Sequence, residues 1–143
     1  MSRVVDWDSL RPIWETTPDV LGAWAFGSAR DGQLRDGGDV DVGILMANPP
    51  TFDDQLALLG RLQDALALDE VDLVVLNDAH VILRFEAVSG RRLFTRDLSA
   101  LAEFVSLTAR EYEDAMALYQ RGLRWRAELS QKRAGTAEPV QRP

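Results

Sequence analysis

The sequence has no cysteine and only one histidine, His80, among its 143 residues. The absence of cysteine excludes disulfides, thiolate zinc sites and cysteine nucleophiles, and it fits a reducing compartment. A single histidine excludes a histidine-based metal cluster and argues against a Ser-His-Asp triad. Carboxylates therefore remain as the natural candidates for metal ligands.

Long apolar runs are also missing. The longest, "VLGAWAF" and "LVVL", are far too short to span a bilayer, and "MSRVVDWDSLRPIWE" lacks the basic and apolar regions of a signal peptide. We therefore expect a cytoplasmic protein without membrane association.

Basic residues are fewer than acidic ones. The 16 Lys and Arg against 23 Asp and Glu give a net charge of -7 and a pI near 4.7. Proteins that depend on many phosphate contacts are usually basic, so this balance argues against general nucleic-acid binding. It permits a small anionic substrate held at a local site, or a basic protein partner.

The pattern of apolar and turn residues predicts one α+β domain at residues 1–129, with a small mixed sheet flanked by helices. Strands are predicted at residues 20–26, 39–45, 70–76 and, as a short edge strand, 91–97. Helices are predicted at residues 6–17, 52–68, 79–90 and 98–129. Residues 130–143, "SQKRAGTAEPVQRP", are polar, and we expect a disordered tail there.

Helix ends and faces carry more specific expectations. Thr51 is expected to cap the second helix, and Gly90 to close the third at its C-cap. The apolar side of the second helix is expected to comprise five residues, namely Phe52, Leu56, Leu59, Leu62 and Leu66.

Two aspartates stand one residue apart in "DVDVGIL". Because alternate residues of a strand share a face, Asp39 and Asp41 lie on one side, while Val40 and Val42 face the core. Two ionised carboxylates ~4 Å apart repel by about 4 kcal/mol at an effective dielectric of 20. Protonation or a divalent cation offsets this repulsion, and hard oxygen ligands suit Mg²⁺.

Asp72 is a third acid, placed in the middle of "EVDLVVL". On a neighbouring strand it would complete a two-metal cluster of the kind that clamps phosphoryl oxygens, or it would accept the proton of an attacking hydroxyl. Taken alone, each acid has an ordinary alternative. A D-x-D pair is often a solvated face or a turn anchor, and an acid in an edge strand can prevent aggregation.

The segment "FGSAR" precedes these acids and follows a predicted strand. Gly27 lets a phosphate approach the backbone, and Ser28 adds a hydroxyl and an amide at a candidate helix N-terminus. Arg30 is close enough in sequence to add positive charge. A phosphate cradle and a metal cluster separated by one short loop predict a nucleoside triphosphate site.

The spacing of these residues resembles a known family. "GSARDGQLRDGGDVD" fits the G-S-x10-D-x-D signature of the nucleotidyltransferase superfamily that includes DNA polymerase β. The short length and "EVDLVVL" resemble the minimal nucleotidyltransferase (MNT) subfamily. The resemblance covers residues 20–76 by motif and, more loosely, the stretch from "RFEAVSGRRLFTRD" to "EYEDAM".

This resemblance implies a polymerase β-like fold. It implies that Gly27 and Ser28 hold the triphosphate of ATP, that Asp39 and Asp41 bind Mg²⁺, and that Asp72 is the third catalytic acid and metal ligand. Many MNT proteins are similar in being antitoxins paired with a HEPN-domain ribonuclease toxin. Active ones transfer AMP from ATP to a tyrosine of that toxin, so a magnesium-dependent protein adenylyltransferase in a hetero-oligomer with a HEPN toxin is expected.

The chain departs from the family at Gly38, where members usually carry a serine. The change removes a hydrogen-bonding group near the triphosphate. Two alternatives stay open, and the glycine bears on the second. One is a nucleotidyltransferase with a small-molecule acceptor, of the aminoglycoside type. The other is a catalytically degenerate MNT antitoxin that neutralises its toxin by binding alone.

Overall fold

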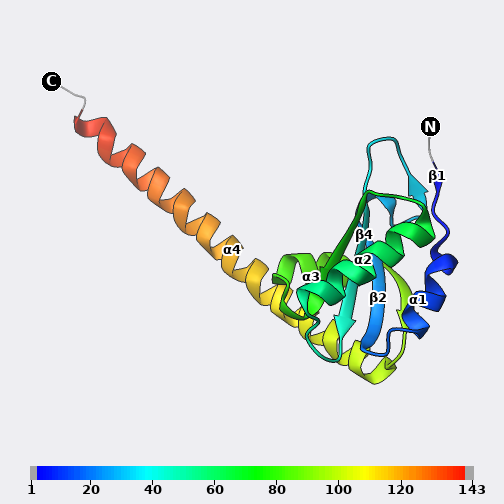
Figure 1. Ribbon diagram of the computed structural model, residues 1–143. Coiled ribbons are helices and arrows are strands. Elements are labelled where there is room, and N and C mark those ends of the chain that lie inside the picture. The colour runs from blue at the N-terminus through cyan, green and yellow to red at the C-terminus, as the bar shows by residue number, and fades with distance from the viewer. Residues whose placement is uncertain (1–2, 141–143) are drawn as a thin grey trace.

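A computed structural model describes the backbone of residues 3–140 and the side chains of residues 3–134. At its centre is a four-stranded mixed sheet in the order β5-β4-β2-β6 (Figure 1). Its strands are β2 (Val20–Phe26), β4 (Val40–Met46), β5 (Val71–Val75) and β6 (Arg91–Thr95). Strand β4 pairs parallel to β5 and antiparallel to β2, and β6 pairs antiparallel to β2. The predicted α+β class and mixed sheet are confirmed.

Helices cover both faces of this sheet. On one face, α1 (Arg11–Glu15) and α2 (Phe52–Leu66) pack on Ala23, Val40 and Val42. On the other, α3 (Val81–Val88) and α4 (Leu98–Val140) pack on Trp24 and Leu45. The division follows from the alternation of side chains along a strand. The side chains of Asp41 and Asp72 alternate with those of the first face and so belong to the face of α3 and α4.

The N-terminal segment contains short elements. The Asp6 side chain caps a 3-10 helix, η1 (Trp7–Leu10), that leads into α1, so the predicted helix at residues 6–17 is confirmed in outline. Strand β1 (Arg3–Val4) pairs with β3 (Gln33–Leu34), and neither was expected. Each has two residues and depends on a partner about thirty positions away, so local periodicity gives no signal for it.

Helix α2 begins as the sequence predicts, but its buried face agrees only in part with the expected one. Thr51 and Asp54 form a reciprocal capping box. The buried side chains are Leu58, Leu62 and Leu66. The exposed fractions of Phe52 and Leu56 are 72% and 50%, so assigning these two to the same face as Leu62 and Leu66 was wrong. Both stripes have helical spacing, and docking on the sheet selects only one of them.

Helix α3 follows η3 (Leu76–Asp78) and differs from expectation at its end. The His80 side chain accepts a hydrogen bond from the Ile82 amide and caps the start of α3. The C-cap residue is Ser89, so assigning this role to Gly90 was wrong. Gly90 is instead demanded by close packing, because a Cβ there would overlap the carbonyl oxygen of Ala25. Strand β6 then forms one edge of the sheet, as predicted.

Helix α4 packs on the domain at its start and then projects away from it (Figure 1). Leu101 and Thr108 are fully buried, and Arg84 on α3 forms an ion pair with Glu111 on α4. The long C-terminal helix is confirmed, but it ends at Val140, so the expected end near Leu129 was wrong. We still predict a domain boundary at residue 129 and a disordered tail at residues 130–143. Of this tail, residues 141–143 lie outside the described part of the chain. No helix among the described residues is long and apolar enough to cross a membrane.

Candidate active site

The D-x-D motif lies at the start of β4, near the middle of the sheet. Val40 and Val42 are fully buried. Asp41 is half-buried on the opposite side of the strand, and Asp39 is exposed just before the strand begins. The valines therefore lie in the core and Asp41 on the other face, as predicted, while Asp39 lies just outside the strand.

Asp41 and Asp72 are direct neighbours. They occupy the same register position of the parallel strands β4 and β5. Burial raises the pKa of Asp41 from 3.8 to about 6, helped by the charge of Asp72 and by a hydrogen bond between the two carboxyls. The charges of Asp39 and Glu86 add smaller increases to this pKa. Negative charge at Asp41 is therefore disfavoured unless a cation or a proton compensates it.

Asp39 lies less close to Asp41 than Asp72 does. Its charge influences Asp41, but its side chain is exposed. Within the part of the chain that is described, no group of three or more His, Asp or Glu side chains is arranged to hold a metal ion. The structure thus brings together two of the three predicted metal ligands and leaves the third at the rim.

The turn after β2 places Gly27 against this carboxylate pair. Phe26 is in register with Asp41, and a Cβ at Gly27 would overlap the Asp41 Oδ2 atom. Gly27 also has φ +76°, which favours glycine. Gly27 and Asp41, fourteen positions apart in sequence, therefore meet at one end of the sheet.

Ser28 and Arg30 follow on this turn with exposed side chains. The expected helix start is a single 3-10 turn, η2 (Gly27–Ala29), and Arg30 is its C-cap. So short an element has little dipole, and the expectation of anion attraction by a helix N-terminus is weakened accordingly. What the turn offers a phosphate is backbone amides, the Ser28 hydroxyl and the Arg30 guanidinium.

Gly38 has a local structural explanation. Its amide donates to the Arg35 carbonyl oxygen at 2.9 Å. A Cβ at this position would lie 3.0 Å from that same oxygen and 3.3 Å from Leu34 Cδ1. A serine here would require the turn to open by a few tenths of an ångström. The glycine thus fits a tight turn before β4, and it removes none of the carboxylates.

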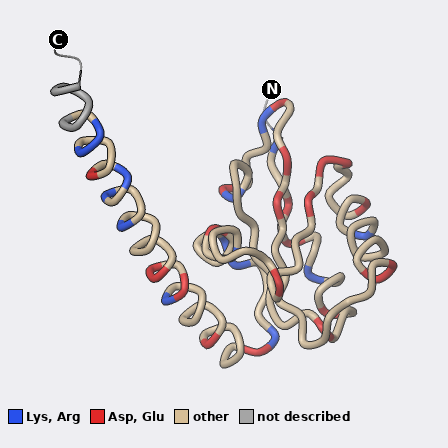
Figure 2. Tube along the Cα trace, turned by 90° about the vertical axis from the view of Figure 1, so that its left-hand side faces the viewer, with Lys and Arg blue, Asp and Glu red and all other residues tan. Residues whose placement is uncertain are grey.

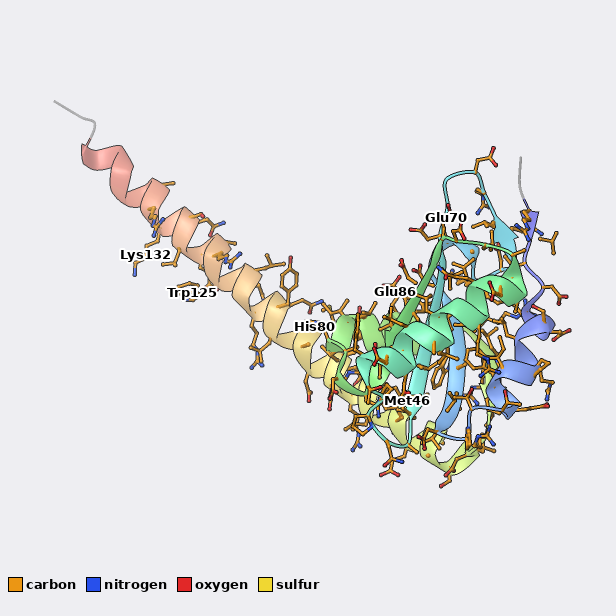
Figure 3. All side chains as sticks on the ribbon, viewed as in Figure 1. Met46, Glu70, His80, Glu86, Trp125 and Lys132 are labelled. Atoms are coloured by element: carbon orange, nitrogen blue, oxygen red, sulfur yellow. The ribbon has the colours of Figure 1, made fainter. Side chains whose placement is uncertain are left out.

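Glu86 contributes to the electrostatics of the site, although it was not among the expected site residues. It lies on α3, and its charge contributes to raising the pKa of Asp41. Glu86 and Glu70 lie toward the same end of the sheet, while Met46 lies toward the other end (Figure 3). The sequence feature that could have identified Glu86 is an acid inside the otherwise apolar helix "VILRFEAV".

A separate cavity of about 290 Å³ lies at the opposite end of β4, between this strand and α2. Met46, Pro49, Leu58 and Arg61 are among its lining residues, and none of the motif residues is. The cavity therefore lies at one end of β4, and the carboxylate pair lies at the other. We assign the site from the carboxylate pair, because Asp41 and Asp72 lie side by side and the raised pKa of Asp41 shows that its charge favours a compensating cation or proton.

The donor set fits Mg²⁺. Carboxylate oxygens are the hard ligands that this ion prefers, and a bound cation would favour the charged form of Asp41 and so lower its pKa. Asp41 and Asp72 would provide ligands from adjacent strands. Asp39 would join them by turning toward the pair, for which its exposed position leaves freedom.

Comparison with known proteins agrees with this geometry. The family model described as "Polymerase beta, Nucleotidyltransferase" matches residues 8–99. A chain in a toxin–antitoxin crystal structure with AMP-PNP superimposes with a TM-score of 0.70, at 24% identity, covering 83% of this chain and 96% of that one. No curated protein matches this chain in sequence.

Two further solved structures are similar. A chain of a mutant form of the toxin–antitoxin MntA-HpeT is 26% identical, with a TM-score of 0.64 over 81% of this chain and 89% of that one. A chain from the complex of a tri-AMPylated HEPN toxin with an MNT antitoxin, from Shewanella oneidensis, is 22% identical, with a TM-score of 0.62 over 81% and 92%. The nucleotidyltransferase fold expected from the sequence is confirmed, and the chain belongs to the polymerase β nucleotidyltransferase family.

Proposed function

We propose that this protein is a magnesium-dependent adenylyltransferase and antitoxin, which transfers AMP from ATP to a tyrosine of a cognate HEPN ribonuclease toxin and thereby neutralises it. One observation carries the proposal: the Asp41–Asp72 pair lies beside the glycine turn at Gly27. That arrangement combines a seat for phosphates with carboxylates that need a cation.

The relatives support the choice of partner and nucleotide. One similar structure holds a tri-AMPylated HEPN toxin with an MNT antitoxin, and another is a toxin–antitoxin with AMP-PNP. The MntA-HpeT structure, at 26% identity, is also a toxin–antitoxin. A HEPN toxin is therefore the partner we propose here, and ATP is the AMP donor.

The reaction needs positioning and charge stabilisation more than covalent chemistry. The phenol oxygen of the acceptor tyrosine forms a bond to the α-phosphorus, the bond from that phosphorus to the bridging oxygen breaks, and pyrophosphate leaves. Mg²⁺ bound by Asp39, Asp41 and Asp72 would neutralise charge on the triphosphate and on the leaving pyrophosphate.

The chain's own groups have separable tasks. Amides of the turn at Gly27 and Ser28 would orient the phosphates, because Gly27 has no side chain between the backbone and Asp41. Arg30, exposed at the end of that turn, would add positive charge to the same phosphates. Asp72 would accept the phenolic proton as the new bond forms.

The test is AMP transfer to the purified toxin, followed by intact-mass spectrometry of the toxin. We expect Asp39→Ala, Asp41→Ala and Asp72→Ala to abolish the added AMP while circular dichroism shows an intact fold. Glu15→Ala, an exposed acid on α1, is the matched control and should keep full transfer. Undiminished AMP addition by Asp41→Ala or Asp39→Ala would contradict the metal assignment.

Binding without catalysis is the second candidate, and one observation favours it. The three acids are not gathered into a ready three-ligand cluster within the described residues. A binding-only antitoxin would suppress toxin activity equally well with and without ATP, and it would leave the toxin mass unchanged. The same assay therefore separates the two candidates, and transfer to an aminoglycoside in place of the toxin would support the small-molecule alternative.

A further inference from the structure

The projecting part of α4 carries exposed apolar side chains. We call residues 117–134 the basic arm, because they include five basic residues and one acidic residue. Within it, Leu118, Tyr119 and Trp125 have exposed fractions of 64%, 61% and 62%, and Leu123 is 45% exposed. Trp125 stands on the helix far from the sheet (Figure 3). Large apolar groups gathered on one exposed helix mark an interaction surface.

Part of this surface, Tyr119 and Leu123, continues the face through which α4 packs on the domain. Nearer the domain, α4 packs through Leu101, Thr108 and Tyr112, and the Tyr112 ring stacks on Phe85 of α3 at a centroid distance of 3.8 Å. Seven residues after Tyr112, at the same position of the helical repeat, comes Tyr119 with most of its surface exposed. The packing face therefore extends beyond the end of α3, and its geometry suits another helix.

The positive charge of the basic arm limits which kind of partner helix can pack against it. The basic arm has five basic residues and one acidic residue, whereas residues 1–116 have ten basic and 21 acidic residues. Figure 2 shows the basic positions recurring along the projecting helix and acidic positions spread over the domain. Two arms side by side would repel each other. The arm instead fits an apolar stripe that has acidic residues beside it.

The chain itself has such a stripe, on α2. Phe52 and Leu56 are 72% and 50% exposed, one helical turn apart, on the side of α2 that faces away from the core. Asp53 and Asp64 lie along one edge of this stripe and are exposed. The one basic residue of α2, Arg61, is turned away, because its guanidinium donates to the hydroxyls of Thr16 and Thr17.

Both helices also have a glycine in the middle. Gly60 in α2 and Gly122 in α4 have no atom within 4 Å of the place where a Cβ would lie, so nothing in the rest of the fold demands glycine there. Glycine inside a helix is destabilising compared with alanine. On the exposed stripes, each glycine would let another helix approach closely.

We propose that the basic arm of one copy of this chain docks on the Phe52–Leu56 stripe of α2 in a second copy, and that the second copy's arm docks reciprocally on the first. The lengths agree, since the arm extends for ~26 Å and α2 for ~22 Å at 1.5 Å per residue. Reciprocal exchange gives a closed two-fold dimer in which both copies contribute the same two surfaces. The proposal does not depend on nucleotide transfer.

Sedimentation of the purified full chain over a range of concentrations is the first test. A monomer has a mass of 16.0 kDa, and we expect a species of twice that mass whose dissociation constant rises with salt. Trp125→Ala should raise this constant at least tenfold. A chain that stays monomeric at every concentration, or a dimer that Trp125→Ala leaves unchanged, overturns the proposal.

Charge exchange is the sharper test. Asp53→Lys with Asp64→Lys should give a monomer, and so should Arg121→Glu with Arg126→Glu. Mixing the two double variants should restore a dimer, because positions 121 and 126 of each arm then meet positions 53 and 64 of opposite charge in the other variant. Arg11→Glu with Glu15→Lys on α1 is the matched control and should leave the dimer intact. Failure of the mixture to associate, while each variant is folded, overturns the proposal.

Crosslinking then identifies the contact itself. Because the chain has no cysteine, Leu56→Cys and Leu118→Cys can be mixed without background thiols. Oxidation of the mixture should give a disulfide joining Leu56→Cys to Leu118→Cys. Crosslinks found only between two Leu118→Cys copies would mean that the arms meet each other, which contradicts docking on α2.

Discussion

Replacing Asp41 by asparagine keeps the size of the side chain and removes its charge. The substitution therefore isolates the cost of placing that charge beside Asp72. The pKa of Asp41 rises from 3.8 to about 6 in the fold. A shift of about two pKa units corresponds to at most ~3 kcal/mol. Asp41 is half-exposed, and solvent screening reduces this to about 1 kcal/mol.

The sign follows from proton linkage. Because the folded state holds this proton more tightly than the unfolded state, the free energy of unfolding falls as the pH rises from about 4 through 6. Asp41→Asn lacks this group and should not show its share of the loss. The variant should match the wild type near pH 4 and exceed it by about 1 kcal/mol at pH 7.5 without metal.

Urea unfolding at pH 4.5 and pH 7.5, in EDTA and in magnesium chloride, measures these differences. Mg²⁺ should recover the lost stability of the wild type at pH 7.5 and have little effect on Asp41→Asn. Glu15→Gln, which removes an exposed acid on α1, is the control and should follow the wild type. If the difference in unfolding free energy between Asp41→Asn and the wild type is the same at pH 4.5 and pH 7.5, the raised pKa of Asp41 is contradicted.

Three further predictions address packing and the phosphate turn. Gly27→Ala should lose roughly 1–3 kcal/mol of unfolding free energy and weaken ATP binding measured by calorimetry, because its Cβ overlaps Asp41 at φ +76°; unchanged affinity would contradict the role of the turn. Leu62→Ala should cost about 2–5 kcal/mol in urea unfolding, since Leu62 is fully buried, whereas Leu56→Ala should stay within about 0.5 kcal/mol in dilute, monomeric protein; equal losses would contradict the observed face of α2. Thr51→Ala should cost about 1 kcal/mol by removing the capping box, and no change would show that the cap is dispensable.

The sheet was predictable because its strands have strong local signals. The apolar run "VLGAWAF" ends at a glycine, and β2 occupies this run from Val20 to Phe26. The face of α2 was not predictable in the same way. Phe52–Leu56 and Leu58–Leu62–Leu66 both have helical spacing, and only contact with the sheet and α1 decides between them.

The acidic residues of the site were predictable from the sequence, but the pairing of the strands that carry them was not. The sequence indicated that Asp72 lies on a strand near the D-x-D motif. That Asp72 pairs directly with Asp41, and not with Asp39, depends on how two parallel strands separated by α2 align. Glu86 was missed because its influence on Asp41 arises only when α3 folds over the sheet. The explanation of Gly38 likewise required the position of the Arg35 carbonyl oxygen.

The central claim is that the Asp41–Asp72 centre transfers the α-phosphoryl group of ATP, as AMP, to the toxin. The most direct measurement is to incubate the protein, its toxin and Mg²⁺ with ATP labelled at either the α- or the γ-phosphate. We predict that the α-label becomes attached to a toxin tyrosine, that the γ-label leaves with pyrophosphate, and that Asp41→Asn abolishes the attachment. Attachment of the γ-label, or undiminished α-labelling by Asp41→Asn, would contradict the claim.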